Sequence, residues 1–270
     1  MDDRVKVTMS DGVADVRLVR ADKMNALDAA MFDALVATSG RLAHEKGLRA
    51  VVLSGEGRAF CAGLDMGRFA AMNEKGGNGV AGGESRDLTA RTHGLANFPQ
   101  QAVWGWRQLP VPVIAAIQGV AFGGGFQLAL GADMRFLAPD ARMSIMEIKW
   151  GLVPDMAGTP ILASLVRDDI LRELTYTGRI FSAQEALSYG LATRICDDPR
   201  AAAFEVAREI AGKSPEAIRA AKRMLNSLAI DPGPALLAES VEQMKLMGTA
   251  NQQEAVRANL EKRAPRFADA

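Results

Sequence analysis

The chain contains little of several residue types that mark specialised classes of protein. Among its 270 residues there are only two cysteines and two histidines. Two cysteines cannot build a disulfide framework, and they suit a reducing compartment, so we expect a cytoplasmic protein. With so few histidines and no closely spaced cysteines, the sequence favours no metal site.

An excess of one charge and long apolar runs are also missing. The 32 basic residues balance the 32 acidic ones, and the calculated pI is about 6.8. This balance provides no basic surface for nucleic acid. No apolar run is long enough to cross a bilayer, and the first residues lack the apolar core of a secretory signal. We therefore expect neither nucleic acid nor a membrane as a partner, and the 49% hydrophobic content is ample for one large domain.

The most informative feature that is present is a glycine-rich turn. An apolar run over residues 111–117 predicts a buried strand, and Gly119-Val-Ala-Phe-Gly-Gly-Gly-Phe-Gln127 follows it. Glycines let the backbone approach a ligand closely, and the unpaired N–H groups of the next helix point to the same place. Such a turn favours a phosphate, a carboxylate or a developing oxyanion. The spacing fits neither a phosphate loop nor a dinucleotide-binding turn, and close packing of a helix on a strand is the alternative interpretation.

A second small-residue turn, over residues 58–65, follows another predicted strand at residues 49–54. Two such turns could aim two backbone N–H groups at one point, which is the geometry of an oxyanion hole. Cys61 lies in this turn. Because no histidine lies near it in the sequence, we interpret it as a small buried thiol and not as a nucleophile.

These segments together resemble the crotonase superfamily, the enoyl-CoA hydratase/isomerase family. Motifs that match the family in its own order lie at residues 16–28, 60–65, 112–125, 174–178, 183–186, 190–192 and 261–267. The resemblance implies an α/β fold, a crotonase-like ββα spiral with a C-terminal helical region. We expect residues 1–198 to form the spiral core with the CoA and acyl site, and residues 199–270 to form a helical oligomerisation region.

The resemblance also implies roles for backbone groups. The N–H groups of Leu64 and Gly124, with Gly123 beside them, would polarise the thioester carbonyl of an acyl-CoA. The CoA moiety would be held by backbone contacts from two segments, which contain Lys23, Met24, Ala26, Ala62, Gly63 and Asp65. Lys262, on the last predicted helix, would approach the CoA phosphates of a neighbouring subunit, since relatives form trimers and dimers of trimers. A homotrimer or homohexamer is therefore expected; coenzyme A is part of the substrate, and no other cofactor is implied.

The acid–base groups distinguish this chain within the family. Hydratases of the family carry one glutamate just after the glycine triplet and a second further along. Gln127 stands at the first position, and an amide can hold a water or a carboxylate but cannot act as a general base. Glu147 matches the second position. Its apolar neighbours predict burial and a raised pKa, and Asp155 would raise that pKa further if the two carboxyls share a cavity.

Each of these three residues also has a simpler interpretation. Glu147 could be a surface residue beside Lys149, and Asp155, which follows a proline, could be a helix cap. Gln127 could be an ordinary residue of the first helical turn.

Three functions remain open at this level. The Glu147/Asp155 pair resembles that of dienoyl-CoA isomerases, which carry a third acid where Gln127 stands, whereas simpler enoyl-CoA isomerases work with one glutamate matching Glu147. We favour a double-bond isomerase, because relocating a proton needs fewer carboxylates than adding water. The alternatives are a hydratase, with Asp155 or a water held by Gln127 replacing the missing glutamate, and a non-catalytic CoA- or RNA-binding protein.

Other segments complete the expected organisation. The glycine-rich stretch at residues 76–83 predicts a mobile loop, either a lid over the acyl site or an unstructured insertion. Helices are predicted at residues 98–106, 160–166, 169–175, 183–189, 199–213, 215–228 and 234–268. Val241, Met244 and Met247 share one face of the last of these and would form an assembly surface or pack against the chain's own core.

Overall fold

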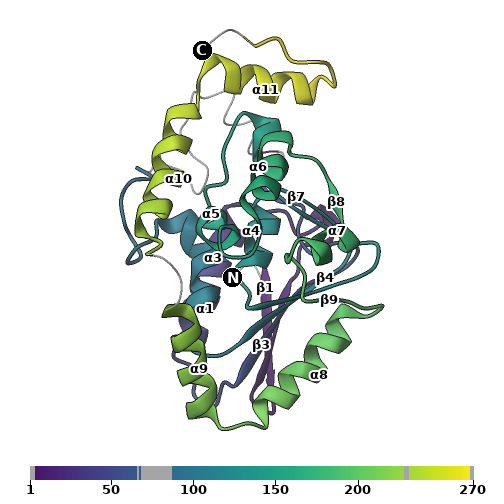
Figure 1. Cartoon of the computed structure of the whole chain (residues 1–270), viewed down its shortest axis with the longest axis vertical. Coiled ribbons are helices and arrows are strands. Elements are labelled where there is room, and N and C mark those ends of the chain that lie inside the picture. Colours follow the sequence, from purple (N-terminus) through teal and green to yellow (C-terminus); the bar gives the residue numbers. More distant parts are fainter. Residues whose placement is uncertain (1–3, 66, 68–86, 228–230, 268–270) are drawn as a thin grey trace.

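The computed structural model describes residues 4–65, 67, 87–227 and 231–267 (Figure 1). The larger of its two sheets has six strands. Its strands, in spatial order, are β1 (Val5–Ser10), β2 (Val13–Leu18), β3 (Ala50–Gly55), β4 (Val113–Ile117), β6 (Met134–Leu137) and β9 (Arg194–Ile195). Only β1 and β2 are antiparallel, joined by a two-residue turn at Asp11 and Gly12 with positive φ at both. The other pairs are parallel. Parallel strands are covered on both faces, which explains the apolar sequence of β3.

The protein also has a second sheet, of three strands. It contains β5 (Val120–Phe122), β7 (Arg142–Ser144) and β8 (Phe181–Ser182). The chain passes from β4 into β5 through Gln118 and Gly119, and a side chain on Gly119 would overlap the backbone of Arg58. The sequence from β4 through β5 into helix α4 is therefore one ββα unit, and it brings the glycine turn to the end of the second sheet.

Helices cover the sheets and extend away from them. They are α1 (Ala29–Ala43), α3 (Phe98–Gln108), α4 (Gly124–Leu130), α5 (Gly158–Leu162), α6 (Asp168–Thr177), α7 (Ala183–Ser188), α8 (Pro199–Ala211), α9 (Pro215–Ser227), α10 (Gly233–Leu246) and α11 (Ala250–Leu260), with short 3-10 turns η1 (Ala21–Lys23) and η2 (Glu147–Trp150). Local chemistry sets several starts: the Asp28 side chain accepts the Met31 N–H before α1, and Ser182 forms a capping box with Glu185 before α7.

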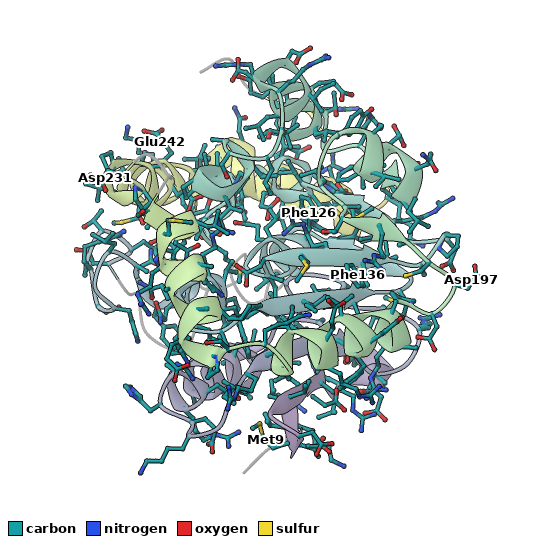
Figure 2. The ribbon with its side chains drawn as sticks, turned by 60° about the horizontal axis from the view of Figure 1, so that its bottom comes forward. Met9, Phe126, Phe136, Asp197, Asp231 and Glu242 are labelled. Atoms are coloured by element: carbon teal, nitrogen blue, oxygen red, sulfur yellow. The ribbon has the colours of Figure 1, made fainter. Side chains whose placement is uncertain are left out.

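The core lies on both sides of the first sheet. One face packs against α1, α3 and α4, and the other against α8, through residues such as Ile114, Phe136 and Ala207. Figure 2 shows Phe126 and Phe136 inside the molecule, whereas Asp197, Asp231 and Glu242 lie at its edge. In α3, Val103 and Trp106 are fully buried and belong to the core.

The C-terminal region differs from the prediction in one respect. The single helix expected over residues 234–268 is wrong: α10 and α11 are separate, and α11 lies across the end of α10 (Figure 1). Gly248 between them has φ 78°, which an L side chain rarely adopts, and the Thr249 side chain caps α11. Met247 is buried and Met244 packs beside it against Leu152 and Val256, which confirms packing against the chain's own core for these two methionines.

The remaining helix predictions agree with the structure to within a few residues, although α5 is shorter than the helix expected at residues 160–166. None of the helices in the described ranges is long and apolar enough to cross a membrane. The glycine-rich stretch at residues 76–83 lies outside the described residues.

Candidate active site

The two small-residue turns lie side by side. Cys61 N donates to Val120 O at 3.0 Å, and Phe122 N donates to Cys61 O at 3.1 Å, so the turn after β3 pairs with β5 as a short parallel ladder. A Cβ on Gly63 would lie only 2.5 Å from Phe122 O and 3.8 Å from Gly124 N. Gly63 also has φ 88°, so both the space and the backbone conformation require glycine there.

The N–H groups of Leu64 and Gly124 are free to act on a ligand. Leu27 pairs with the residues on either side of Leu64: its N–H donates to Gly63 O, and its carbonyl accepts from Asp65 N. This parallel pattern leaves the Leu64 N–H unused. Gly124 is the first residue of α4, so its N–H has no partner within the helix. Neither group donates a hydrogen bond within the described part of the chain, and both residues line the same cavity.

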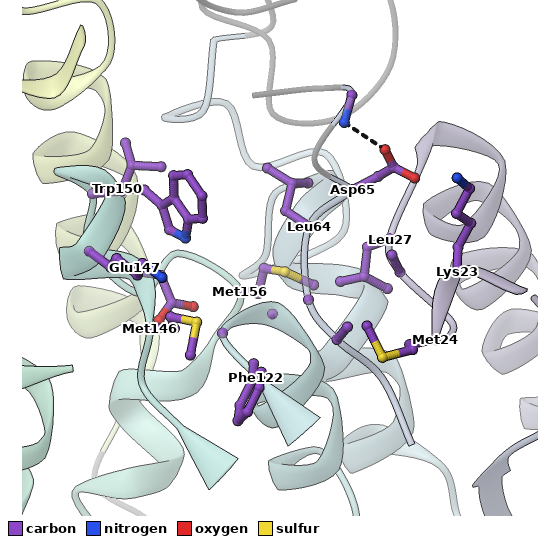
Figure 3. Close-up of a pocket in the computed structure, with 18 of the residues that line it drawn as sticks. Lys23, Met24, Leu27, Leu64, Asp65, Phe122, Met146, Glu147, Trp150 and Met156 are labelled. Atoms are coloured by element: carbon purple, nitrogen blue, oxygen red, sulfur yellow. Dashed lines mark hydrogen bonds between the residues drawn. The ribbon is translucent and has the colours of Figure 1, made fainter. Parts of the chain in front are cut away.

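That cavity has a volume of about 680 Å³ and contains most of the predicted site (Figure 3). All of the residues proposed from the sequence line it except Gln127 and Lys262. Glu147 and Trp150 lie on one side and Lys23 and Met24 on the other (Figure 3). The wall between them is largely apolar, with Leu64, Phe122 and Met156, as is typical of a small-molecule site.

The segment around Lys23 is held in place by Asn25, which the sequence analysis did not single out. Met24 and Asn25 both have positive φ, and Asn tolerates this conformation better than most residues. The fully buried Asn25 amide donates to Glu56 O and Ala59 O. It thereby ties the first loop to the turn after β3, so two cavity walls are fixed to one another.

Glu147 is a buried acid with one free oxygen. It is 9% exposed at the start of η2, so the surface interpretation is wrong. Burial raises the pKa of Glu147 to about 7, although hydrogen bonds from Gln127 and from the backbone oppose the shift. Gln127 Nε2 donates to Glu147 Oε1 at 2.6 Å, whereas Glu147 Oε2 has no hydrogen-bond partner.

Gln127 lies behind the cavity wall, not in it. Its Oε1 accepts the N–H groups of Met156 at 2.9 Å and Gly158 at 3.0 Å, which fixes the orientation of the amide. Its Nε2 therefore faces Glu147. The Gln127 side chain thus links Glu147 to the turn after Pro154. It does not line the cavity, so it is not placed to hold a water there.

Asp155 is the second buried acid of the wall. It is 5% exposed, and it does not cap α5, whose N-cap residue is Ala157. Burial, followed by the charges of Glu147 and Glu239, raises the pKa of Asp155 to about 8, although a hydrogen bond from the Gln243 side chain opposes the shift. Asp155 Oδ2, like Glu147 Oε2, has no hydrogen-bond partner.

The C-terminal helices complete the cavity, which sequence reasoning missed. Gln243 on α10 and Asn259 on α11 line it, and Asn259 Nδ2 donates to Lys149 O at 2.7 Å. No motif marks these two residues, because they reach the site only through packing. Lys262 does not lie on the last helix as expected: it follows the end of α11 and is exposed with φ 56°.

Cys61, in the turn after β3, is a free cysteine. Its side chain is fully buried, and burial raises the pKa of the thiol to about 12. It is therefore a small buried thiol, as the sequence predicts. Within the described ranges, no group of three or more His, Cys, Asp or Glu side chains could hold a metal ion.

Comparisons with known proteins agree with this geometry. A family model described as enoyl-CoA hydratase/isomerase matches residues 8–270. The carnitinyl-CoA dehydratase of Proteus mirabilis is 34% identical over 247 residues, 89% of this chain and 88% of that one. The Delta(3,5)-Delta(2,4)-dienoyl-CoA isomerase of Mus musculus is 32% identical over 214 residues, 78% of this chain and 64% of that one.

Among solved structures, an enoyl-CoA hydratase/isomerase from Pseudoalteromonas atlantica superposes with a TM-score of 0.83 at 28% identity, covering 98% of this chain and 100% of that one. The chain therefore belongs to the enoyl-CoA hydratase/isomerase, or crotonase, family. The predicted α/β crotonase fold with C-terminal helices is confirmed.

Proposed function

We propose that this crotonase-family acyl-CoA enzyme is a double-bond isomerase that acts on an enoyl- or dienoyl-CoA through Glu147 and Asp155. One observation carries the proposal. The cavity wall holds two buried carboxyl oxygens without partners, Glu147 Oε2 and Asp155 Oδ2, whereas the amide of Gln127 is occupied by the protein itself. The site therefore offers two buried proton carriers, and the amide of Gln127 cannot act as a third.

The first step is the formation of an enolate. The thioester carbonyl oxygen accepts the N–H groups of Leu64 and Gly124, which stabilise the negative charge that develops there. Glu147, as carboxylate, removes a proton from the carbon next to the carbonyl. The low polarity that raises its pKa to about 7 also makes it a stronger base than an exposed glutamate.

The second step returns a proton further along the acyl chain. Asp155, whose pKa of about 8 keeps it protonated at neutral pH, donates that proton, and the double bond moves towards the carbonyl. Glu147 ends protonated and Asp155 ionised, and a proton exchanged between them or with solvent restores the starting state. The atoms of the substrate are unchanged in number, as isomerisation requires.

Hydration is the second candidate, and the two carboxyls are also the observation that favours it. If Glu147 and Asp155 held one water between them, the protein would add it across a 2-enoyl-CoA. Relatives of this kind exist: methylglutaconyl-CoA hydratase of Mus musculus is 29% identical over 264 residues. We place hydration second because the position that follows the glycine triplet is Gln127, an amide that does not line the cavity and cannot act as a general base.

Product analysis separates the two reactions. Purified protein is incubated in D₂O with a 3-enoyl-CoA, a 3,5-dienoyl-CoA and a trans-2-enoyl-CoA in turn. An isomerase gives a product of unhydrated mass with a relocated double bond, detected by NMR, and incorporates deuterium. A trans-2-enoyl-CoA that gains one water would overturn the proposal in favour of the hydratase, and CoA-ester binding without turnover would indicate a non-catalytic protein. The Glu147→Gln variant is the control for each substrate.

We also propose that residues 23–26 and 62–65 bind the CoA moiety and that the chain forms trimers or hexamers through its C-terminal region. Lys262 lies outside the cavity of its own chain, which is consistent with a contact to CoA in a neighbouring subunit. Sedimentation analysis measures the oligomeric state. In a trimer with shared sites, Lys262→Ala raises KM for the CoA ester without changing kcat.

A further inference from the structure

In the turn that carries Asp155, almost all backbone N–H groups donate to side chains of other elements. Gln127 accepts the N–H groups of Met156 and Gly158. Two residues of α10 accept the others: Gln243 Oε1 accepts from Val153 N at 3.1 Å, Glu239 Oε2 from Ala157 N at 2.9 Å, and Glu239 Oε1 from Thr159 N at 2.8 Å. Pro154 has no N–H. Apart from the N–H of Asp155 itself, every amide donor from Val153 to Thr159 is accepted by one of these three side chains.

Glu239 is the charged member of this group, and it is not in the cavity wall. It is 5% exposed, and Gln100 Nε2 on α3 donates to its Oε2 at 3.0 Å. Both of its oxygens accept N–H donors, an arrangement that suits the ionised carboxylate. Burial raises the pKa of Glu239 to about 7, while these donors oppose the shift, so the group is ionised above neutral pH.

The charge of Glu239 acts on Asp155. Two negative groups act on Asp155, Glu147 from η2 and Glu239 from α10, and both disfavour its ionised form. The cation near Glu239 is Arg91, whose guanidinium interacts electrostatically with it and donates to Ser240 Oγ at 2.8 Å. Arg91 is only partly buried and is not among the groups that act on Asp155, so Glu239 is the charged residue through which α10 acts on Asp155; Gln243 of the same helix donates to the Asp155 side chain and opposes that effect.

We propose that Glu239 is a positioning residue of the reaction: from behind the cavity it fixes the turn that presents Asp155 and places a negative charge next to it. This inference rests on the proposed role of Asp155 as proton donor. It holds for either isomerisation or hydration, because both need Asp155 in a fixed place and protonation state.

The pH dependence of kcat tests this role in the Glu239→Gln variant. Asp155 must be protonated to donate, so activity falls as pH rises through its pKa. Removing the neighbouring charge lowers that pKa, and the alkaline limb moves to lower pH by about one unit. Because Glu239 does not line the cavity, KM for the CoA ester stays within about two-fold while kcat falls. A purely structural role would lower kcat and leave the limb in place.

Two matched variants sharpen this test. Glu239→Asp keeps the charge, so its alkaline limb stays at the wild-type pH even if kcat is lower. Glu242→Gln removes an exposed carboxylate of the same helix, which pairs with Lys245, and leaves the whole profile unchanged. If Glu239→Gln does not yield folded protein, Gln100→Leu replaces it. This variant removes the hydrogen bond that Gln100 donates to Glu239, so the ionised form of Glu239 is less stable. Less negative charge then acts on Asp155, and the alkaline limb moves to lower pH, as in Glu239→Gln.

A double-mutant cycle separates failure of this inference from failure of the proposed function. If Glu239 acts through Asp155, adding Glu239→Gln to Asp155→Asn changes kcat by less than about two-fold. An unmoved alkaline limb in Glu239→Gln, or full additivity in the cycle, overturns the inference. Full activity of Asp155→Asn alone would instead overturn the proposed role of Asp155.

Discussion

At the scale of single residues, Gln127 has the clearest consequence for chemistry. An amide in this place donates to Oε1 of Glu147, while Oε2 has no hydrogen-bond partner. The amide thus gives Glu147 a defined orientation without adding a second negative charge beside it, and burial alone accounts for most of its raised pKa.

The Glu147→Gln variant should lose turnover. An amide of the same size keeps the shape of the cavity wall but cannot accept the substrate proton, so we expect kcat to fall about 10²–10⁴-fold. Affinity for a CoA ester should change little, because the backbone N–H groups of Leu64 and Gly124 remain. Steady-state kinetics and calorimetric titration measure the two quantities; retained turnover would show that Glu147 is not the base.

The Gln127→Glu variant should shift the acid limb of the pH–rate profile upwards. A carboxylate at this place accepts the N–H groups of Met156 and Gly158, so it stays ionised and faces Glu147 Oε1. The like charge raises the pKa of Glu147, and the base becomes available only about one pH unit higher or more. Gln127→Met removes the donor to Glu147 but adds no charge, so its limb should move upwards by less than that of Gln127→Glu. An unmoved limb in Gln127→Glu would contradict the contact.

At the scale of elements, the close approach of α4 to the turn after β3 brings together the two N–H groups that we propose as the oxyanion hole. A Cβ on Gly125 would overlap the carbonyl oxygen of Cys61 and lie 2.8 Å from its Sγ. Since the neighbouring atom is backbone, it cannot rotate away. The helix can therefore lie against this turn only with glycine at that position, and the distance between the Leu64 and Gly124 N–H groups depends on it.

Gly125→Ala should therefore destabilise the fold by about 1–3 kcal/mol or more and reduce activity with it. Gly40→Ala is the matched control, since Gly40 lies inside α1 with nothing within 4 Å of its Cβ position. That substitution should stabilise the protein by about 0.5–1 kcal/mol, because alanine favours helix. Urea denaturation measures both, and equal effects would contradict the packing argument.

At the scale of the whole molecule, three buried acids make stability depend on pH. Glu147 and Glu239 have pKa values of about 7 and Asp155 of about 8. All three lie above the values in an unfolded chain, which are about 4. The folded state thus binds more protons between these limits. Their stabilising contribution is complete at low pH and is lost as pH rises towards 8.

Thermal unfolding should show this dependence as a lower Tm at about pH 8 than at about pH 5.5. Each of the three acids changes the free energy of unfolding by at most about 1.4 kcal/mol per pH unit. Asp155→Asn does not titrate, so the difference in Tm between the two pH values should shrink. Asp169→Asn, which removes an exposed carboxylate paired with Arg167, should leave the difference unchanged. A Tm that rises with pH over this range would contradict the raised pKa values of the three buried acids.

The amino-acid sequence by itself determined the features that depend on local chemistry. The apolar runs of β3 and β4, the glycines at positions 63 and 119 and the cap at Ser182 follow from strand burial, allowed φ angles and side-chain hydrogen bonds within a few residues. The order of the two turns and of Glu147 and Asp155 is likewise readable along the chain, as is the family they indicate.

Only the tertiary structure decided how these pieces act on one another. Glu239 reaches Ala157 and Gln243 reaches Val153 across more than eighty positions of sequence, and nothing near either residue in the sequence marks its partner. The same packing places Gln127 behind the cavity wall and makes Asp155 a buried acid and not a helix cap. Burial and charge coupling are properties of the assembled interior, so the raised pKa values of Glu147, Asp155 and Glu239 arise only when the chain is folded.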